Sequence, residues 1–72
     1  MPRTVLLGRV EAFDAARGTG SVIDQGGRVL PFHCTAIADG SRHIEVGAAV
    51  AFTAVPGHLG RLEATGLIDV GP

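Results

Sequence analysis

The chain has 72 residues, 46% of them hydrophobic and 18% charged, and its formal net charge is −1. This length predicts a single domain over residues 1–72, and the hydrophobic fraction excludes wholesale disorder. No apolar run is long enough to span a bilayer, and the N-terminal residues lack the pattern of a signal peptide. We therefore expect a soluble, cytoplasmic protein that does not associate with membranes.

Basic and aromatic residues are both sparse for a nucleic-acid-binding protein. Six arginines stand against seven acidic residues, lysine is absent, and three phenylalanines are the only aromatic residues. Proteins that bind nucleic acid through bulk attraction to phosphate usually carry a basic excess. The composition by itself therefore argues against tight binding to nucleic acid.

The first half of the chain predicts three strands. Residues 5–13 are rich in β-branched and aliphatic side chains, and a turn over 14–18 begins with Asp and ends with Gly. A second, short strand is expected over 19–24. The glycine pair within residues 25–27 predicts a hairpin that leads into a third strand over 29–34.

The second half predicts one helical turn and two further strands. Residues 35–37 fit a single helical turn, and residues 38–41 contain an Asp-Gly pair that predicts a loop. Residues 48–55 give the clearest strand of the chain, because alternation places Val50 and Phe52 on one face.

A Pro-Gly turn over 56–60 precedes a last strand over 62–70, in which alternate residues from Leu62 to Ile68 share one face. Five short strands cannot form a two-sheet sandwich with a real core, but they can close into a small barrel without exposed edges. The pattern therefore predicts an all-β fold, a five-stranded antiparallel barrel of the OB-like or SH3-like type.

The single cysteine and its histidine neighbour do not predict a metal site or an enzyme. His33 and Cys34 are adjacent in a strand, so their side chains point to opposite sides. No Cys-x-x-Cys or His-x-x-x-His spacing brings ligands together on one ion, and no carboxylate is placed to orient a histidine base. We expect neither a cofactor nor catalysis.

Four segments of the chain resemble bacterial cold-shock proteins. Residues 8–22 (GRVEAFDAARGTGSV) resemble the family's opening, G-K-V-K-W-F-N-x-x-K-G-[YF]-G-F-I, and residues 30–37 (LPFHCTAI) resemble V-F-V-H-F-[ST]-A-I. Residues 44–52 are similar to L-x-E-G-x-x-V-x-F, and residues 56–64 to x-G-x-x-G-x-x-A. The resemblance extends over residues 7–69 and needs one short deletion near residues 38–41.

This resemblance implies a five-stranded OB-like barrel that binds single-stranded RNA or DNA. Members of the family stack bases on aromatic side chains of the second and third strands, a mode that tolerates many sequences. This chain retains five of the family's functional positions, namely Arg9, Phe13, Arg17, His33 and Arg42. At the three arginine positions the family has lysine. These five are the expected nucleic-acid-binding residues, and arginine can itself stack on a base or bind phosphate bidentately.

Most of the family's base-stacking aromatics are replaced in this chain. The six positions are occupied by small residues or proline, namely Ala12, Thr19, Ser21, Pro31, Cys34 and a position near Ser41. The expected binding is therefore weak and atypical. The alternative is a barrel that has lost nucleic-acid binding, whose smoothed face packs against a protein partner or a second copy in a homodimer.

Two phenylalanines are open to two interpretations each. Phe13 is either a residue of the core or barrel rim, which is the favoured interpretation, or a residue of the binding face. Pro31 can mark a bulge that turns Phe32 outward as a stacking platform, or Phe32 can fill the core where the family has Val. Alternation from Leu30 favours the core position for Phe32.

Overall fold

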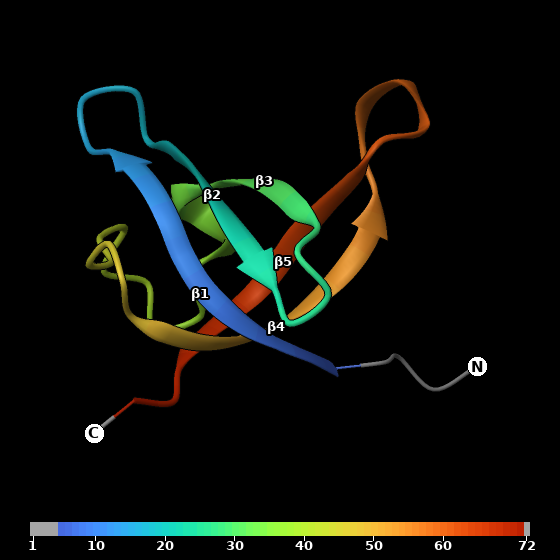
Figure 1. Cartoon of the computed structure of the whole chain (residues 1–72). Helices are drawn as coiled ribbons and strands as arrows, with labels where there is room; N and C mark the ends of the chain where they lie inside the picture. The colour runs from blue at the N-terminus through green and yellow to red at the C-terminus, as the bar shows by residue number, and fades with distance from the viewer. Residues whose placement is uncertain (1–4, 72) are drawn as a thin grey trace.

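Five antiparallel strands form one sheet in the computed structural model, which describes residues 5–71 (Figure 1). The strands are β1 (Val5–Asp14), β2 (Thr19–Asp24), β3 (Val29–His33), β4 (Ala49–Pro56) and β5 (Leu62–Asp69). Each predicted strand is present, with ends within one residue of those expected. Residues 1–4 and 72 of the predicted domain lie outside the described residues.

Two short 3-10 turns complete the described elements, η1 (Cys34–Ala36) after β3 and η2 (His58–Gly60) between β4 and β5. The first confirms the predicted helical turn, one residue earlier than expected, and the second lies within the predicted Pro-Gly turn. Within residues 5–71, no helix combines the length and the hydrophobicity that crossing a bilayer demands.

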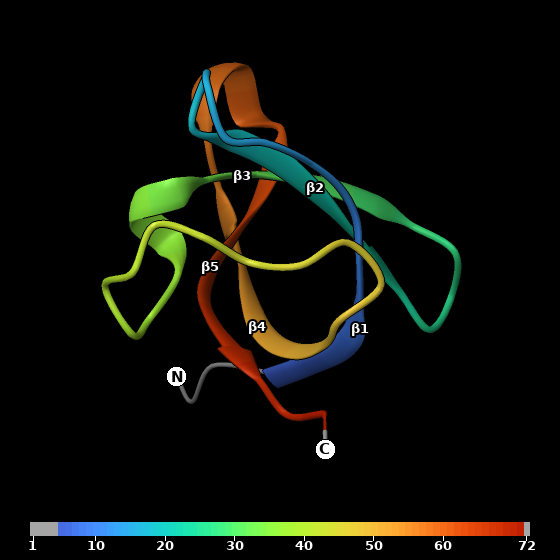
Figure 2. The same ribbon diagram turned by 90° about the vertical axis from the view of Figure 1, so that its left-hand side faces the viewer.

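The strand order is β3-β2-β1-β4-β5, so β3 and β5 are the two edges of the sheet. The sheet is strongly curved, and the curvature brings these two edges into contact (Figure 2). Beyond the end of β3, the amide of Ala38 donates a hydrogen bond of 2.8 Å to the carbonyl of Leu67 on β5. The long sheet thus encloses an interior on its concave side.

The core fills this interior with aliphatic and aromatic side chains. Phe32 and Phe52 are its largest members and are only 2% and 1% exposed. The other buried residues are Val10, Val22, Leu30, Ile37, Ile44, Val50, Ala64 and Leu67. The core position of Phe32 is confirmed, and no polar side chain is buried among the described residues.

Pro31 lies on an edge strand, where a missing backbone N–H costs least. It pairs with Ser21 on β2, while the other side of β3 is the edge of the sheet. Its ring is exposed and the following residue, Phe32, points into the core. Proline therefore causes no outward turn of Phe32.

The strict alternation expected along the last strand is wrong beyond Thr65. Thr53 pairs with Thr65 but Ala51 pairs with Ile68, so β5 contains one more residue than β4 at this point. Gly66 has a φ of +63° there, a conformation that favours glycine. The bulge buries Leu67 at 1% exposure and leaves Ile68 55% exposed, the reverse of simple alternation from Ala64.

Candidate nucleic-acid interface

The convex side of β1, β2 and β3 presents a continuous set of exposed or half-buried side chains. Because Leu30 and Phe32 point into the core, their neighbours on β3 point outward. We call the outer face the side chains on this convex side, which are Arg9, Glu11, Ala12, Thr19, Ser21, Ile23, Val29, Pro31 and His33.

Cross-strand pairing arranges the outer face in three rows. Arg9 pairs with Ile23, which pairs with Val29, at one end. Thr19 pairs with His33 at the other end, close to the turn between β1 and β2. The outer face therefore runs obliquely over three strands, from an arginine to a histidine.

The middle row of the outer face consists of small, uncharged side chains. Ala12 pairs with Ser21, which pairs with Pro31. These three residues occupy positions at which the cold-shock motifs carry aromatic residues. The backbone places them side by side, so the row has the position of a stacking platform but lacks the rings.

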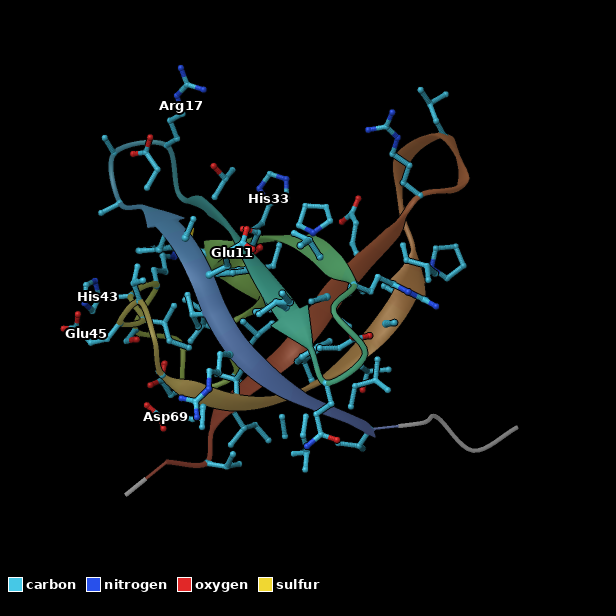
Figure 3. The ribbon with its side chains drawn as sticks, viewed as in Figure 1. Glu11, Arg17, His33, His43, Glu45 and Asp69 are labelled. Carbon is cyan, nitrogen blue, oxygen red and sulfur yellow. The ribbon has the colours of Figure 1, made fainter. Side chains whose placement is uncertain are left out.

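A β-bulge in β1 places an acidic residue beside this row. The register with β2 shifts between Val10 and Ala12, which leaves Glu11 as the extra residue. Ser21 Oγ donates a hydrogen bond of 3.4 Å to Glu11 Oε1, so Glu11 also lies on the outer face (Figure 3). This carboxylate was not among the residues predicted from the sequence, although the quoted cold-shock motif has lysine at its position.

Arg9 marks one end of the outer face. Its side chain is exposed, and Nη1 donates a hydrogen bond of 3.3 Å to the carbonyl of Gly47, in the loop before β4. This contact holds the guanidinium beside the face and uses one of its five donors. The remaining donors suit a phosphate.

Arg17 projects from the β1–β2 turn at the opposite end (Figure 3). Asp14 shapes this turn, because its Oδ1 accepts hydrogen bonds from the amides of Ala16 and Arg17 at 3.1 and 3.2 Å. Arg17 Nε lies 3.8 Å from Asp14 Oδ2, and the arginine side chain is 82% exposed. An exposed pair of this kind is weak and leaves the guanidinium accessible to an anion.

Phe13 lies on the concave side of the sheet. It pairs with Gly20 on β2, which in turn pairs with Phe32 on β3. The half-buried ring of Phe13 stacks on Phe32, with centroids 6.0 Å apart and an interplanar angle of 2°. His43, from the long loop before β4, meets the same ring edge-on at 5.8 Å. Phe13 therefore closes one end of the core, which is the rim position foreseen as one of its two interpretations.

Arg42 precedes His43 in that loop and is exposed, with a φ of +59°. The five predicted residues thus form two groups. Arg9 and His33 lie on the outer face with Arg17 at its end, whereas Phe13 and Arg42 lie at or beside the rim. His43 was missed because its partner is 30 residues away in the chain, a contact that no local pattern signals.

Cys34 and the acidic side chains in the described part of the chain are not arranged as a metal site. Cys34 is half-buried at the start of η1, and a side chain at Gly18 would meet its Sγ at 3.0 Å. No group of three or more His, Cys, Asp or Glu residues in the described part of the chain is arranged to hold a metal ion.

Comparisons with known proteins add no family to this description. No protein-family model matches the chain, and no curated protein matches it either. The resemblance to cold-shock proteins therefore rests on the motif residues themselves.

Proposed function

We propose that this chain is a cold-shock-like OB barrel that binds single-stranded RNA or DNA weakly across the outer face. The strand order β3-β2-β1-β4-β5 and the contact between β3 and β5 support a barrel of this type. The observation that carries the functional proposal is the position of two arginines and a histidine. Arg9 lies at one end of the outer face, and Arg17 and His33 lie at the other.

The spacing of Arg9 and Arg17 suits contact with two separate phosphates of one strand. Arg9 and Asp14, which begins the turn that carries Arg17, are five residues apart on β1. Because Glu11 is the extra residue of the bulge, the strand advances by only four residues of β2, and at about 3.3 Å per residue the turn that carries Arg17 begins roughly 13 Å from Arg9. The imidazole of His33, at the same end of the outer face as Arg17, offers a surface on which one base can stack.

The composition of the outer face supports the low affinity that we propose. Each base that loses its aromatic platform forfeits about 1–3 kcal/mol of stacking energy. Glu11 adds a negative charge beside the middle row, where it repels phosphate. Binding therefore depends on a few charge contacts, and we propose a binding role rather than a catalytic one.

A salt titration tests the proposal most simply. We would measure the Kd for a short fluorescein-labelled single-stranded oligonucleotide, in DNA and RNA forms, by anisotropy over a range of salt concentrations. Each phosphate contact contributes about 0.7 to the slope of log K against log salt. We expect Arg9→Ala and Arg17→Ala each to lower both the affinity at low salt and this slope.

The matched control is Ile68→Asp, which lowers the net charge by one as each arginine-to-alanine change does, because Ile68 is 55% exposed and borders a pocket that contains no residue of the outer face. It should leave the slope unchanged. Absence of binding at millimolar protein and low salt would overturn the proposal and favour the protein-interaction alternative. An equal loss on Ile68→Asp would overturn the assigned surface.

A further inference from the structure

A groove of about 450 Å³ lies on the side of the molecule formed by the 37–45 loop and β5. Ile37, Ile44 and Leu67 form an apolar floor and are at most 6% exposed. Ile68, which the bulge in β5 turns outward, adds an exposed apolar wall. The groove is therefore shaped to bury an aliphatic side chain.

Three carboxylates stand around this apolar floor, those of Asp39, Glu45 and Asp69. Figure 3 shows Glu45 and Asp69 on the same side of the molecule. Asp39 Oδ1 accepts the amide of Ser41 at 2.8 Å, and Asp69 Oδ1 accepts the amide of Gly71 at 2.9 Å. These bonds orient two of the carboxylates. The three carboxylates form the rim of the groove and would attract a cation beside the aliphatic side chain that the groove buries.

Hydrogen bonds from the backbone and side chain of Ser41 lower the pKa of Asp39. Asp39 therefore remains ionised at neutral pH. Glu45 is 83% exposed and lies 3.4 Å from His43 Nε2, so its charge also faces solvent at the edge of the groove. The site accordingly selects an aliphatic side chain that has a positive charge beside it.

The β4–β5 turn of this same chain carries such a pair. Leu59 is 85% exposed and has a φ of +57°, which costs a leucine about 1–2 kcal/mol. Arg61 is exposed two residues later. Leu59 is thus a bulky apolar residue that is both strained and exposed to solvent. Binding of its side chain to a partner would explain this combination.

The turn cannot reach the groove of its own molecule. Figure 1 shows the β4–β5 turn at the upper right and the loop that borders the groove at the left, on opposite sides of the sheet. The two surfaces can therefore meet only between two copies of the chain. Because they differ from each other, the contact is head-to-tail rather than two-fold symmetric.

We propose that a second copy of this chain docks its β4–β5 turn into the groove, with Leu59 on the apolar floor and Arg61 against the carboxylate rim. The groove lies apart from the outer face, whereas Arg61 borders Val29 and Pro31 at the edge of that face. The association is reversible and concentration-dependent, and salt weakens it because the rim contacts are exposed.

Sedimentation velocity over a range of protein concentrations tests this contact. We expect the weight-average mass of the wild-type chain to rise with concentration. Leu59→Ser, which removes the inserted side chain, and Glu45→Arg, which reverses one rim charge, should each remain monomeric. Val5→Ser is the matched control, because Val5 is 64% exposed but lies outside both surfaces.

Mixing the two defective variants separates docking from a general loss of solubility or fold. Leu59→Ser keeps an intact groove and Glu45→Arg keeps an intact turn. Their mixture should therefore form a one-to-one dimer and no larger oligomer. A wild-type chain that stays monomeric at millimolar concentration would overturn the proposal. So would a mixture that stays monomeric, or a Val5→Ser variant that loses association equally.

Discussion

Phe13 and Phe32 stack in parallel across β2, with their ring centroids 6.0 Å apart. The residue between them in the cross-strand row is Gly20, which pairs with Phe13 on one side and with Phe32 on the other. A Cβ at Gly20 would lie 2.7 Å from Phe32 Cζ and 2.5 Å from the carbonyl oxygen of Ala12. The stack therefore depends on the absence of a side chain at this position.

Gly20→Ala should destabilise the fold by at least about 1–3 kcal/mol, the usual cost of overpacking a core. Urea unfolding followed by circular dichroism measures this loss. Gly26→Ala is the control, since a Cβ there would meet only Asp24 Oδ1, at 3.4 Å, and we expect little change. Equal stability of the two variants would contradict the role of Gly20.

Replacement of Phe13 distinguishes its rim position from a role in binding. Truncating a fully buried phenylalanine costs about 3–5 kcal/mol, and Phe13 is half-buried, so we expect Phe13→Ala to cost about half of that. Its affinity for the oligonucleotide, measured by anisotropy below the unfolding transition, should change less than about twofold. A tenfold loss of affinity in the folded variant would instead place Phe13 in the interface.

Much of the fold could be predicted from the sequence, because strand and turn signals are local. The alternation of Val50 and Phe52, for example, fixes both the strand and its buried face. The bulge at Gly66 could not be predicted in this way. Glycine permits a positive φ without requiring it, and only the pairing with β4 determines that Leu67 rather than Ile68 is buried.

The candidate site was less predictable than the fold for the same reason. Motif positions identify Arg9 and His33 along the chain, but cross-strand register decides that they share one face. The packing of His43 on Phe13 joins a loop to a strand that is distant in sequence. Such contacts depend on the path of the whole chain, which no short segment encodes.

Asp14 has two roles that different substitutions separate. Asp14→Asn retains an acceptor for the amides of Ala16 and Arg17 but removes the charge beside Arg17. We expect this variant to keep its stability and to bind the oligonucleotide a few times more tightly at low salt. Asp14→Ala loses the acceptor as well and should be less stable by about 1 kcal/mol. Weaker binding by Asp14→Asn would count against a phosphate contact at Arg17.

Restoring one ring to the middle row should restore affinity. Ala12 is exposed on the outer face, so Ala12→Trp adds a stacking platform without disturbing the core. A gain of about 1–3 kcal/mol corresponds to a Kd lower by roughly 5- to 150-fold. Ala15→Trp, on the exposed β1–β2 turn, is the control for a general effect of tryptophan. No gain over this control would show that bases do not approach the row.

The most direct test of the account is a two-dimensional ¹H–¹⁵N spectrum of the chain titrated with a short single-stranded oligonucleotide at low salt. We expect the amides of the outer face, from Arg9 through Ala12 and Ser21 to His33, to shift progressively and to return on addition of salt. An unchanged spectrum at millimolar concentrations, or shifts confined to the groove near Ile44, would contradict it.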